Sequence, residues 1–419
     1  MWKRLWVAGG QAVAQMWDKM AEEAKIQVIH KSSPAHPGVF QDVGKRATMN
    51  GKLFNHIEIF CKVVDNFGDA GVCLRLAREL HRRSQAAVTL WIDQPQTLAA
   101  MMDGTAADAG VQVRPWTATF VPETVGDLVI EAFACGLPGA QLQAMAARGR
   151  APVWVNLEYL SCEDWVAGCH GRASPHPSLP LTCHFFFPGF TENTGGLLRE
   201  AGLLEAQAAF TQDARARYWQ QWGEEEACVS VSLFSYEAPF LQDCLRAWAG
   251  GEERLRLAVP QGRVWASLAR FCGGVLPAGT ARDFGALRVL SLPFVTQAEY
   301  DRLLWACDTN IVRGEDSWVR AHWAQRPFLW HAYVQEDQAH LAKLAAFHDW
   351  YGKGLTAKVR AAWQAASSAW NAGAFSFAHW QAWRAHWPQL REHAQQRARA
   401  LAAGAELASC LLDFAAGVA

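Results

Sequence analysis

Two consecutive runs of alternating strand and helix signals constrain the fold of this chain more than any other feature. Short β-branched segments predict strands, and segments with helical periodicity predict the connections between them. The first run predicts strands at 57–63, 87–92, 127–133, 152–158 and 184–187 and helices at 71–83, 94–102 and 138–148. The second run predicts strands at 227–234, 254–259, 287–292, 309–313 and 327–331 and helices at 238–249, 261–271, 297–306 and 317–325. This rhythm predicts an α/β fold with two Rossmann-like domains, each built on a mainly parallel sheet, facing a central cleft.

The two runs also divide the 419 residues into parts, because a chain of this length has room for two or three domains. We predict one Rossmann-like domain over 51–215, a second over 216–390, and a C-terminal helical tail over 391–419 that can brace the first domain. For residues 1–50 we predict a poorly ordered extension, since the pattern there is only weakly amphipathic. A targeting or docking helix is the alternative, although the Arg and Ser bias of a transit peptide is missing.

Composition narrows the class of protein. Hydrophobic residues make up 51% of the chain and charged residues 19%, which is enough for large cores. The formal net charge of −1 gives no support to a nucleic-acid binder or a membrane-surface binder. Eleven cysteines without a C-x-x-C pair, no signal peptide and no long apolar run predict a cytoplasmic protein. The Cys and His residues between 162 and 184 match no zinc module, so we favour buried thiols over a zinc site.

An acidic turn lies between the first predicted strand and the first predicted helix. We call residues 63–71 the acidic turn; it contains Asp65, Asp69 and two glycines but no lysine. In open α/β sheets such a turn lies at the carboxyl end of a strand, where ligands bind. A phosphate cradle offers bare backbone N–H groups, whereas this turn offers negative charge. The acidic turn therefore predicts a site that meets a cation.

A second polar cluster ends a strand in the second half of the chain. We call residues 313–317, Arg-Gly-Glu-Asp-Ser, the arginine turn. Ser317 is a plausible N-cap for the helix that follows, and a helix N-terminus beside Arg313 is suited to an anion. The alternative is a plain capped helix in which Glu315 and Asp316 complement the dipole. Because the two turns end strands in successive halves, we expect them to share one site between the domains.

Several motifs, in order along the chain, resemble one known family. They are Asp-Asn-Phe-Gly-Asp-x-Gly-Val-Cys at 65–73, Asn-Leu-Glu-Tyr-Leu-Ser at 156–161, Phe-Phe-Phe-Pro-Gly-Phe-Thr at 185–191, Thr-Gly-Gly-Leu at 194–197, Ser-Leu-Phe-Ser-Tyr-Glu at 232–237, Leu-Pro-Phe-Val-Thr-Gln at 292–297, Arg-Gly-Glu-Asp-Ser at 313–317 and Trp-His-Ala-Tyr at 330–333. Together they are similar to the EarP family, bacterial protein-arginine rhamnosyltransferases that modify elongation factor P. The resemblance runs from about residue 52 into the C-terminal region and leaves 1–50 outside it.

The resemblance implies a GT-B glycosyltransferase whose C-terminal domain holds the donor and whose N-terminal domain holds the acceptor protein. The implied reaction is inverting transfer of rhamnose from dTDP-β-L-rhamnose to one arginine of elongation factor P, with no cofactor and no metal. It carries catalytic roles onto Asp65, Asp69 and Glu315, with Asp69 as base and Asp65 as the residue that orients the acceptor. The donor-binding residues that it implies are Phe234, Tyr236, Phe294, Gln297, Arg313, Glu315, Asp316, Ser317 and Tyr333.

Elementary chemistry shows why carboxylates suit an arginine acceptor. A guanidinium has a pKa of about 12.5–13.8, so deprotonating it at pH 7 costs roughly 8–9 kcal/mol. An aspartate is too weak a base to do this before attack, but a nitrogen that has given its lone pair to the sugar becomes acidic. We therefore expect a carboxylate to orient the guanidinium, stabilise its charge and accept the proton late. For Asp316, which would repel a diphosphate, we expect a cap, a sugar hydroxyl or Arg313 as the partner.

Alternatives remain at the level of residues and of function. Asp65 is also typical of a turn in which Asp bonds its own backbone, and each aromatic taken alone is more typical of core packing. A GT-B enzyme with another donor or a small-molecule acceptor is one alternative function, although a sugar hydroxyl needs one base and not paired carboxylates. A non-catalytic module that binds a basic protein surface through the acidic turn is the other.

Overall fold

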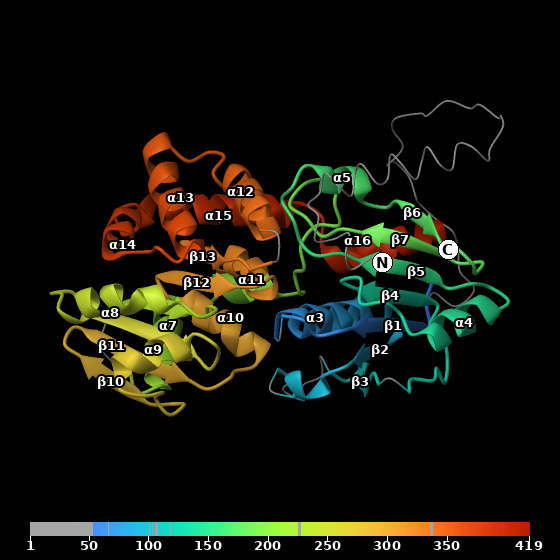
Figure 1. Ribbon diagram of the computed structural model, residues 1–419, viewed down its shortest axis with the longest axis horizontal. Coiled ribbons are helices and arrows are strands. Elements are labelled where there is room, and N and C mark those ends of the chain that lie inside the picture. The colour runs from blue at the N-terminus through green and yellow to red at the C-terminus, as the bar shows by residue number, and fades with distance from the viewer. Residues whose placement is uncertain are drawn as a thin grey trace.

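The computed structural model describes residues 53–419 apart from 66, 100, 103, 105–107, 118, 225–227 and 336–337. The predicted extension at 1–50 lies outside the described residues. The described chain forms two α/β halves side by side, with α3 of the first half directed toward α10 and α11 of the second (Figure 1). No helix in the described ranges has the length and apolar character needed to cross a bilayer.

The first half is built on a sheet of seven described strands in the order β3-β2-β1-β4-β5-β7-β6. All neighbours pair in parallel except β6 with β7. The strands are β1 (His56–Cys61), β2 (Ala87–Ile92), β3 (Val111–Pro115), β4 (Leu128–Ala132), β5 (Val153–Leu157), β6 (Ala173–Pro175) and β7 (Thr182–Phe186). The helices of this half are α3 (Phe67–Ser84), the 3-10 turn η2 (Pro95–Thr97), α4 (Gly139–Ala147) and α5 (Trp165–Cys169).

The second half holds a sheet of six described strands in the order β10-β11-β9-β8-β12-β13, parallel except for β10. The strands are β8 (Val229–Leu233), β9 (Leu255–Pro260), β10 (Ala281–Phe284), β11 (Leu287–Leu292), β12 (Thr309–Arg313) and β13 (Phe328–His331). The helices between and around them are α6 (Leu203–Ala208), α7 (Gln212–Gln220), η3 (Pro239–Leu241), α8 (Gln242–Ala249), α9 (Trp265–Cys272), α10 (Gln297–Ala306) and α11 (Asp316–Ala324). The predicted α/β class with two mainly parallel sheets is confirmed.

The chain ends in five further helices that do not all stay with the second half. They are α12 (Ala339–Tyr351), α13 (Ala357–Asn371), α14 (Phe377–Arg384), α15 (Trp387–Ala403) and α16 (Leu407–Val418). Helices α12 to α15 extend the core of the second half, whereas α16 lies in the first half against α3 (Figure 1). Leu407 and Leu411 of α16 are buried in the same cluster as β1 and α3. The C-terminus therefore ties the two halves together.

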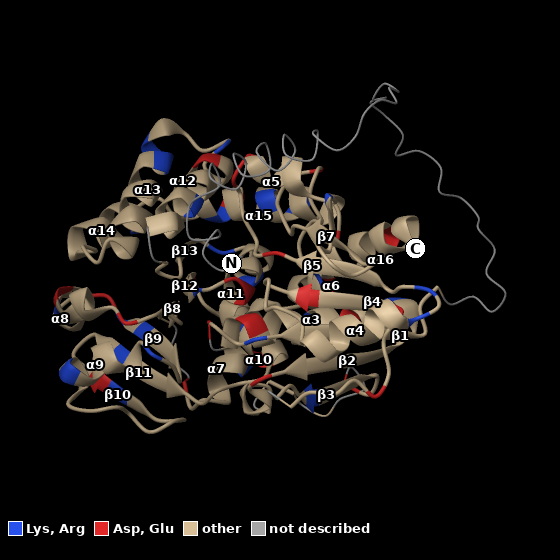
Figure 2. Ribbon diagram, turned by 45° about the vertical axis from the view of Figure 1, so that its right-hand side comes forward, with Lys and Arg blue, Asp and Glu red and all other residues tan. Residues whose placement is uncertain are grey.

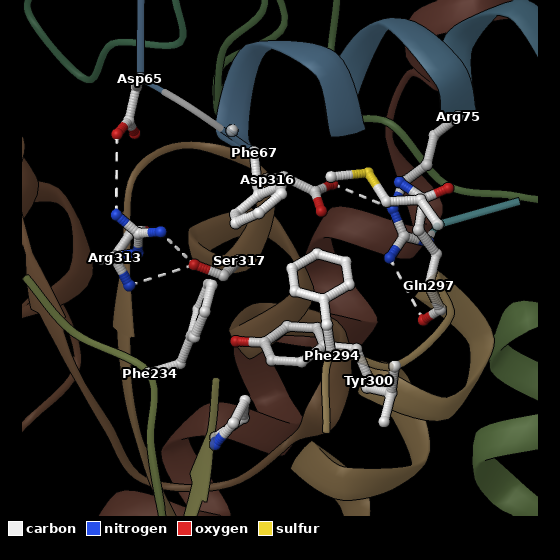
Figure 3. Close-up of a pocket in the computed structure, with 14 residues that line it drawn as sticks. Asp65, Phe67, Arg75, Phe234, Phe294, Gln297, Tyr300, Arg313, Asp316 and Ser317 are labelled. Atoms are coloured by element: carbon white, nitrogen blue, oxygen red, sulfur yellow. Dashed lines mark hydrogen bonds and ion pairs between the residues drawn. The ribbon is translucent and has the colours of Figure 1, made fainter. Parts of the chain in front are cut away.

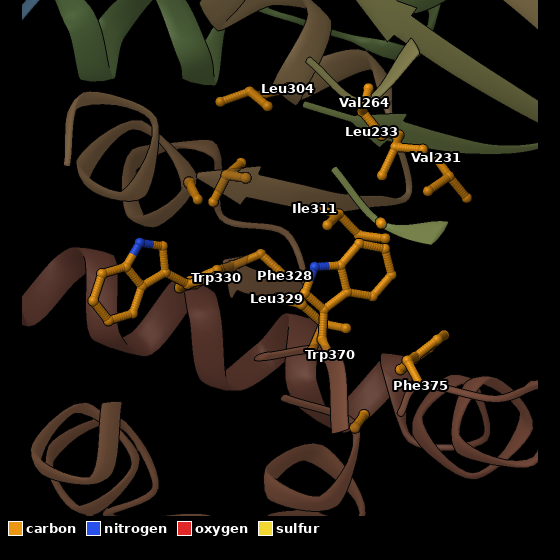
Figure 4. Packing of buried hydrophobic residues seen from close by; sticks show 14 of the residues in the cluster. Val231, Leu233, Val264, Leu304, Ile311, Phe328, Leu329, Trp330, Trp370 and Phe375 are labelled. Atoms are coloured by element: carbon orange, nitrogen blue, oxygen red, sulfur yellow. The ribbon is translucent and has the colours of Figure 1, made fainter. Parts of the chain in front are cut away.

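Tryptophan accounts for much of the packing in the second half. Its largest apolar cluster includes Trp318, Trp330 and Trp370, and Figure 4 shows Trp330 and Trp370 among strand residues such as Ile311. Trp318 and Trp330 stack with ring centroids 3.8 Å apart and an interplanar angle of 7°. Because Trp318 belongs to α11 and Trp330 to β13, this stack fixes the start of α11 against the sheet.

The sequence prediction differs from the structure in several short segments, among them α5, which it does not contain. Strands β3, β6 and β10 were not predicted, and each is a short strand at the edge of its sheet. The predicted helix at 94–102 is wrong, because the described residues of this range form η2 and no longer helix. The hydroxyl of Thr97 donates to the carbonyl of Gln94 at 2.7 Å, and such a local bond closes a tight turn in competition with a longer helix.

In both sheets the strand order reverses next to a strand that carries one of the two predicted turns. In the first sheet β1 lies between β2 and β4, and in the second β8 lies between β9 and β12. The acidic turn follows β1, and the arginine turn follows β12. Ligands of open α/β sheets bind outside the carboxyl ends of the strands at such a switch point. The topology therefore places both turns where a ligand is expected.

Candidate functional site

The acidic turn and the arginine turn touch across the gap between the two halves. Tyr236, just beyond β8, donates its hydroxyl to Oδ2 of Asp65 at 2.6 Å. Nη1 of Arg313 lies 3.9 Å from Oδ1 of the same carboxylate, and Figure 3 shows Asp65 and Arg313 directed toward each other. A Cβ added to Gly314 would lie 2.5 Å from Oδ2 of Asp65. The site thus consists of a negative side and a positive side in direct contact.

Asp65 occupies the centre of this contact. Burial raises the pKa of its carboxyl, while the bond from Tyr236 and the charge of Arg313 act in the opposite direction. Gly68 N–H donates to the carbonyl of Asp65 at 2.8 Å, which closes the turn before α3. The side chain itself points across the gap, so the alternative of an Asp that only bonds its own backbone does not describe it.

Asp69 lies in the first turn of α3 and is 3% exposed. Its Oδ2 accepts the backbone N–H groups of Val64 at 2.8 Å and Asp65 at 2.9 Å, so one carboxylate oxygen holds the acidic turn in shape. Burial raises the pKa of Asp69 to about 6, although those two bonds and a hydrogen bond with Tyr159 favour the charged form. The result is a carboxylate whose basicity is well above that of an exposed aspartate.

Glu315 is the other carboxylate with raised basicity. Its Oε2 accepts the backbone N–H of Leu160 at 2.9 Å, and its Oε1 pairs with Lys343 of α12 at 3.1 Å. Burial raises the pKa of Glu315 to about 7, opposed by Lys343, and the nearby charge of Asp69 raises it further. The bond to Leu160 joins the two halves of the protein beside the acidic turn.

Arg313 has the surroundings of an anion-binding group. Its guanidinium carbon lies 4.7 Å from the ring centroid of Phe234 and 4.8 Å from that of Tyr236. The side chain is almost fully buried, and its Nε and Nη1 donate to no atom of the described residues. Buried donors without an acceptor are costly, so this guanidinium is suited to an anionic ligand in the pocket.

Ser317 and Asp316 lie in the first turn of α11 but not in the predicted roles. The predicted N-cap is wrong: Glu315 holds the N-cap position, and the hydroxyl of Ser317 donates to the carbonyl of Arg313. Gly314, with φ of 61°, curves the turn so that this carbonyl lies over the hydroxyl. The prediction that Asp316 can hold Arg313 is also wrong, since Asp316 Oδ1 pairs with Nε of Arg75 in α3 at 2.9 Å.

A pocket of about 580 Å³, its open mouth included, lies between the two turns. Figure 3 shows Phe234, Phe294 and Tyr300 gathered below Arg313 in this pocket. The predicted residues that line it are Asp65, Phe234, Phe294, Gln297, Arg313, Asp316 and Ser317. Aromatic rings and charged groups therefore line the same pocket, a combination suited to a ligand with both a ring and a charged group.

Four predicted residues do not line the pocket. Asp69 and Glu315 lie behind it, and Tyr236 lies beside it with its hydroxyl on Asp65. Tyr333 is 37% exposed and meets Tyr236 edge to face, with ring centroids 5.7 Å apart. The structure thus brings all the predicted residues into one region, with Asp65 and Asp69 of the acidic turn on one side of the pocket.

Comparison with known proteins decides the family. A family profile described as Elongation-Factor P (EF-P) rhamnosyltransferase EarP matches residues 57–416. A protein-arginine rhamnosyltransferase of Pseudomonas putida is 48% identical over 368 residues, which cover 85% of this chain and 97% of that protein. The chain belongs to the EarP family.

Two further relatives agree with this membership. A protein-arginine rhamnosyltransferase of Pseudomonas aeruginosa is 44% identical over 368 residues, which cover 85% of this chain and 98% of that protein. A solved structure described as the structural basis for EarP-mediated arginine glycosylation of translation elongation factor EF-P is 37% identical, with a TM-score of 0.62 over 86% of this chain and 98% of that one. This EarP-family protein is therefore an enzyme of the glycosyltransferase class with the GT-B fold.

The sequence prediction missed one group of residues in this EarP-family site. Arg75 and Arg78 of α3 reach across to the second half: Arg75 pairs with Asp316, and Nη1 of Arg78 donates to Oε1 of Gln297 at 2.8 Å. Arg75 and Arg78 lie between the apolar positions of the helical pattern, which is typical of a solvated face, yet Arg75 is 3% exposed. Nothing in the local sequence distinguishes an arginine on a solvated face from one that a second domain covers.

Proposed function

We propose that this enzyme transfers rhamnose from dTDP-β-L-rhamnose to an arginine side chain of elongation factor P, with inversion at the anomeric carbon. Family membership supports the reaction class. One observation supports the assignment of an acceptor side and a donor side to the site. The acidic turn, which suits a guanidinium, lies directly opposite Arg313, which suits a diphosphate. A cationic acceptor and an anionic leaving group then approach the sugar from opposite sides.

On the donor side, Arg313 and the N-terminus of α11 would bind the diphosphate. The buried guanidinium offers two unused donors, and the helix N-terminus adds partial positive charge. Phe234 and Phe294 would contact the thymine, since both rings line the pocket. The contacts of Arg313 and the helix N-terminus with the diphosphate strengthen as charge develops on the leaving phosphate, which is the condition for stabilising the transition state.

On the acceptor side, Asp69 would accept the proton and Asp65 would orient the guanidinium. Because the acceptor keeps its positive charge until it attacks, two carboxylates near the anomeric carbon stabilise the growing charge. The new C–N bond forms as the C–O bond to the diphosphate breaks, and the excess proton on nitrogen passes to Asp69. A single displacement from the side opposite the leaving group inverts the anomeric carbon.

The proposed donor chemistry needs no divalent cation. Metal-dependent transferases neutralise the diphosphate with a cation held by carboxylates, whereas here Asp316 is paired with Arg75 and Asp65 with Tyr236. We propose that Arg313 and the α11 N-terminus take that charge instead.

Intact-mass measurement of elongation factor P tests the proposed function. Incubation with the enzyme and dTDP-rhamnose, with EDTA present, is expected to add one deoxyhexose, and peptide mapping is expected to place it on an arginine. No gain in mass, with stable binding of elongation factor P, would favour a binding module. Modification supported better by UDP- or GDP-sugars in a parallel reaction would favour a different donor.

The pH dependence of transfer follows from the basicity of Asp69. Its pKa is raised to about 6, and only the deprotonated carboxylate accepts a proton. We therefore expect kcat/KM to fall below about pH 6, by about tenfold per unit for a single essential base. Initial rates from pH 4.5 to 8 measure this, with dTDP binding followed over the same range as the control. A plateau that extends down to pH 4.5 would contradict the assignment.

Gly314→Ala is expected to reduce transfer by about 100-fold or more and to destabilise the fold by about 1 kcal/mol. The φ of 61° favours glycine, and the added Cβ would lie 2.5 Å from the Asp65 carboxylate, so that carboxylate must move. Thermal melting and initial rates measure the two effects.

Gly273→Ala is the matched control for Gly314→Ala. Gly273 has φ of 70°, and a Cβ there meets nothing within 4 Å. It should lose similar stability and keep its activity. Equal activity in the two variants would show that the close approach of Gly314 to Asp65 is dispensable.

A further inference from the structure

Five charged side chains gather where α3 packs against α10 and α11. They are Arg75, Glu200, Asp301, Asp316 and Arg320, and we call them the charge cluster. Arg75 lies 2.7 Å from Glu200, 3.4 Å from Asp301 and 2.9 Å from Asp316. Arg320 lies 2.5 Å from Glu200 and 2.7 Å from Asp301. Figure 2 shows red and blue ribbon segments in the region of α10 and α11.

Gln297, at the start of α10, adds neutral bonds to the seam between α3 and the second half. Its side-chain NH₂ donates to the carbonyl of Gly71 at 2.9 Å, and its side-chain oxygen accepts from Arg78. Its backbone carbonyl accepts Nη2 of Arg75 at 3.4 Å. Arg75 therefore contacts both α10 and α11 from a position six residues after Asp69 on the same helix.

The energetics of the charge cluster indicate that it specifies one arrangement of the two halves relative to each other. Buried ion pairs cost as much in desolvation as they return in attraction, so they contribute little net stability. Arg75 and Arg320 are almost fully buried, and three carboxylates share these two guanidinium groups. Moving α3 away would remove Arg75 and leave Asp316 without an ion-pair partner among the described residues. All five charged groups have ion-pair partners only when the two halves are closed.

The ion pair between Arg75 and Asp316 connects the two reactive turns by a short path. Arg75 follows the acidic turn along α3, and Asp316 belongs to the arginine turn, next to Glu315. A displacement of α3 along this seam would change the distance from Asp69 to any sugar held below Arg313. Misplacement of reacting groups by 1 Å can cost about 100-fold in rate.

We propose that Arg75 is a positioning residue that locks the acidic turn against the arginine turn for transfer. It acts through Asp316, Asp301 and Gln297 and takes no part in the bond changes. This inference rests on the proposed function, because it assumes that sugar transfer occurs between the two turns.

Arg75→Gln tests the proposal by separating donor binding from turnover. We expect a folded protein whose kcat at saturating donor and acceptor falls 30- to 100-fold, while the Kd for dTDP changes less than threefold. Calorimetry with dTDP, thermal melting and initial rates of elongation factor P modification measure these quantities. Arg82→Gln is the matched control, because among the described residues the ion pair of Arg82 is with Glu79 of the same helix and not with the second half; it should leave kcat unchanged.

Arg78→Met is the second variant, in case Arg75→Gln does not fold. It removes the bond from Arg78 to Gln297 at a less buried position and should lower kcat about 5- to 10-fold with dTDP binding intact. Unchanged kcat in whichever of the two variants folds would overturn the proposal. So would a loss in dTDP affinity that equals the loss in kcat/KM, because that would make Arg75 a donor ligand. Wild-type enzyme in the same assay tests the proposed function separately, since its inactivity would reject the function and not the role of Arg75.

Discussion

Asp69→Asn is expected to lower kcat for transfer to elongation factor P by at least about 10³-fold while dTDP binding changes little. The substitution keeps an oxygen that can accept the N–H groups of Val64 and Asp65, so the acidic turn should hold its shape. What it removes is a carboxylate whose pKa is raised to about 6, the group that we propose takes the proton of the alkylated guanidinium. Single-turnover rates with excess enzyme, beside calorimetry with dTDP, measure the two quantities.

Asp93→Asn is the matched control for this substitution. Oδ1 of Asp93 accepts the backbone N–H of Val63 at 2.9 Å, so it also supports the acidic turn with a carboxylate. Since Asp93 does not face the arginine turn in any described contact, its variant should retain transfer within a few-fold. Substantial activity in Asp69→Asn would remove Asp69 from the mechanism and leave Asp65 and Glu315 as the remaining candidates for the base.

The predictable part of this molecule is the part specified by short-range sequence. The strand–turn–helix order around 63–71 placed Asp65 and Asp69 at the carboxyl end of β1, because a strand pattern, glycines and a helical pattern follow one another there. The same holds for Arg313 at the end of β12. Two parallel sheets with turns at their switch points then place these residues in one region.

The unpredictable part depends on how the two halves close. Arg75 has the sequence context of an exposed helical arginine, and only the approach of α10 and α11 buries it. Glu200 lies in a connection with no strong pattern of its own, yet it pairs with arginines from both halves. The N-cap prediction for Ser317 is wrong for a local reason instead: Glu315 holds the N-cap position and the hydroxyl of Ser317 donates to the carbonyl of Arg313, which residue types alone do not reveal.

Arg313→Met is expected to lower kcat/KM about 10²- to 10³-fold and the affinity for dTDP about 10- to 100-fold. Methionine retains the length and apolar character of the arginine stem against Phe234 and Tyr236, so the aromatic pocket should survive. The loss should fall on the diphosphate alone, and thymidine, which lacks it, provides the internal control: its affinity should stay the same. Calorimetry with both ligands, together with initial rates, measures the effect. Equal losses for dTDP and thymidine would show that Arg313 shapes the base pocket and does not bind the leaving group.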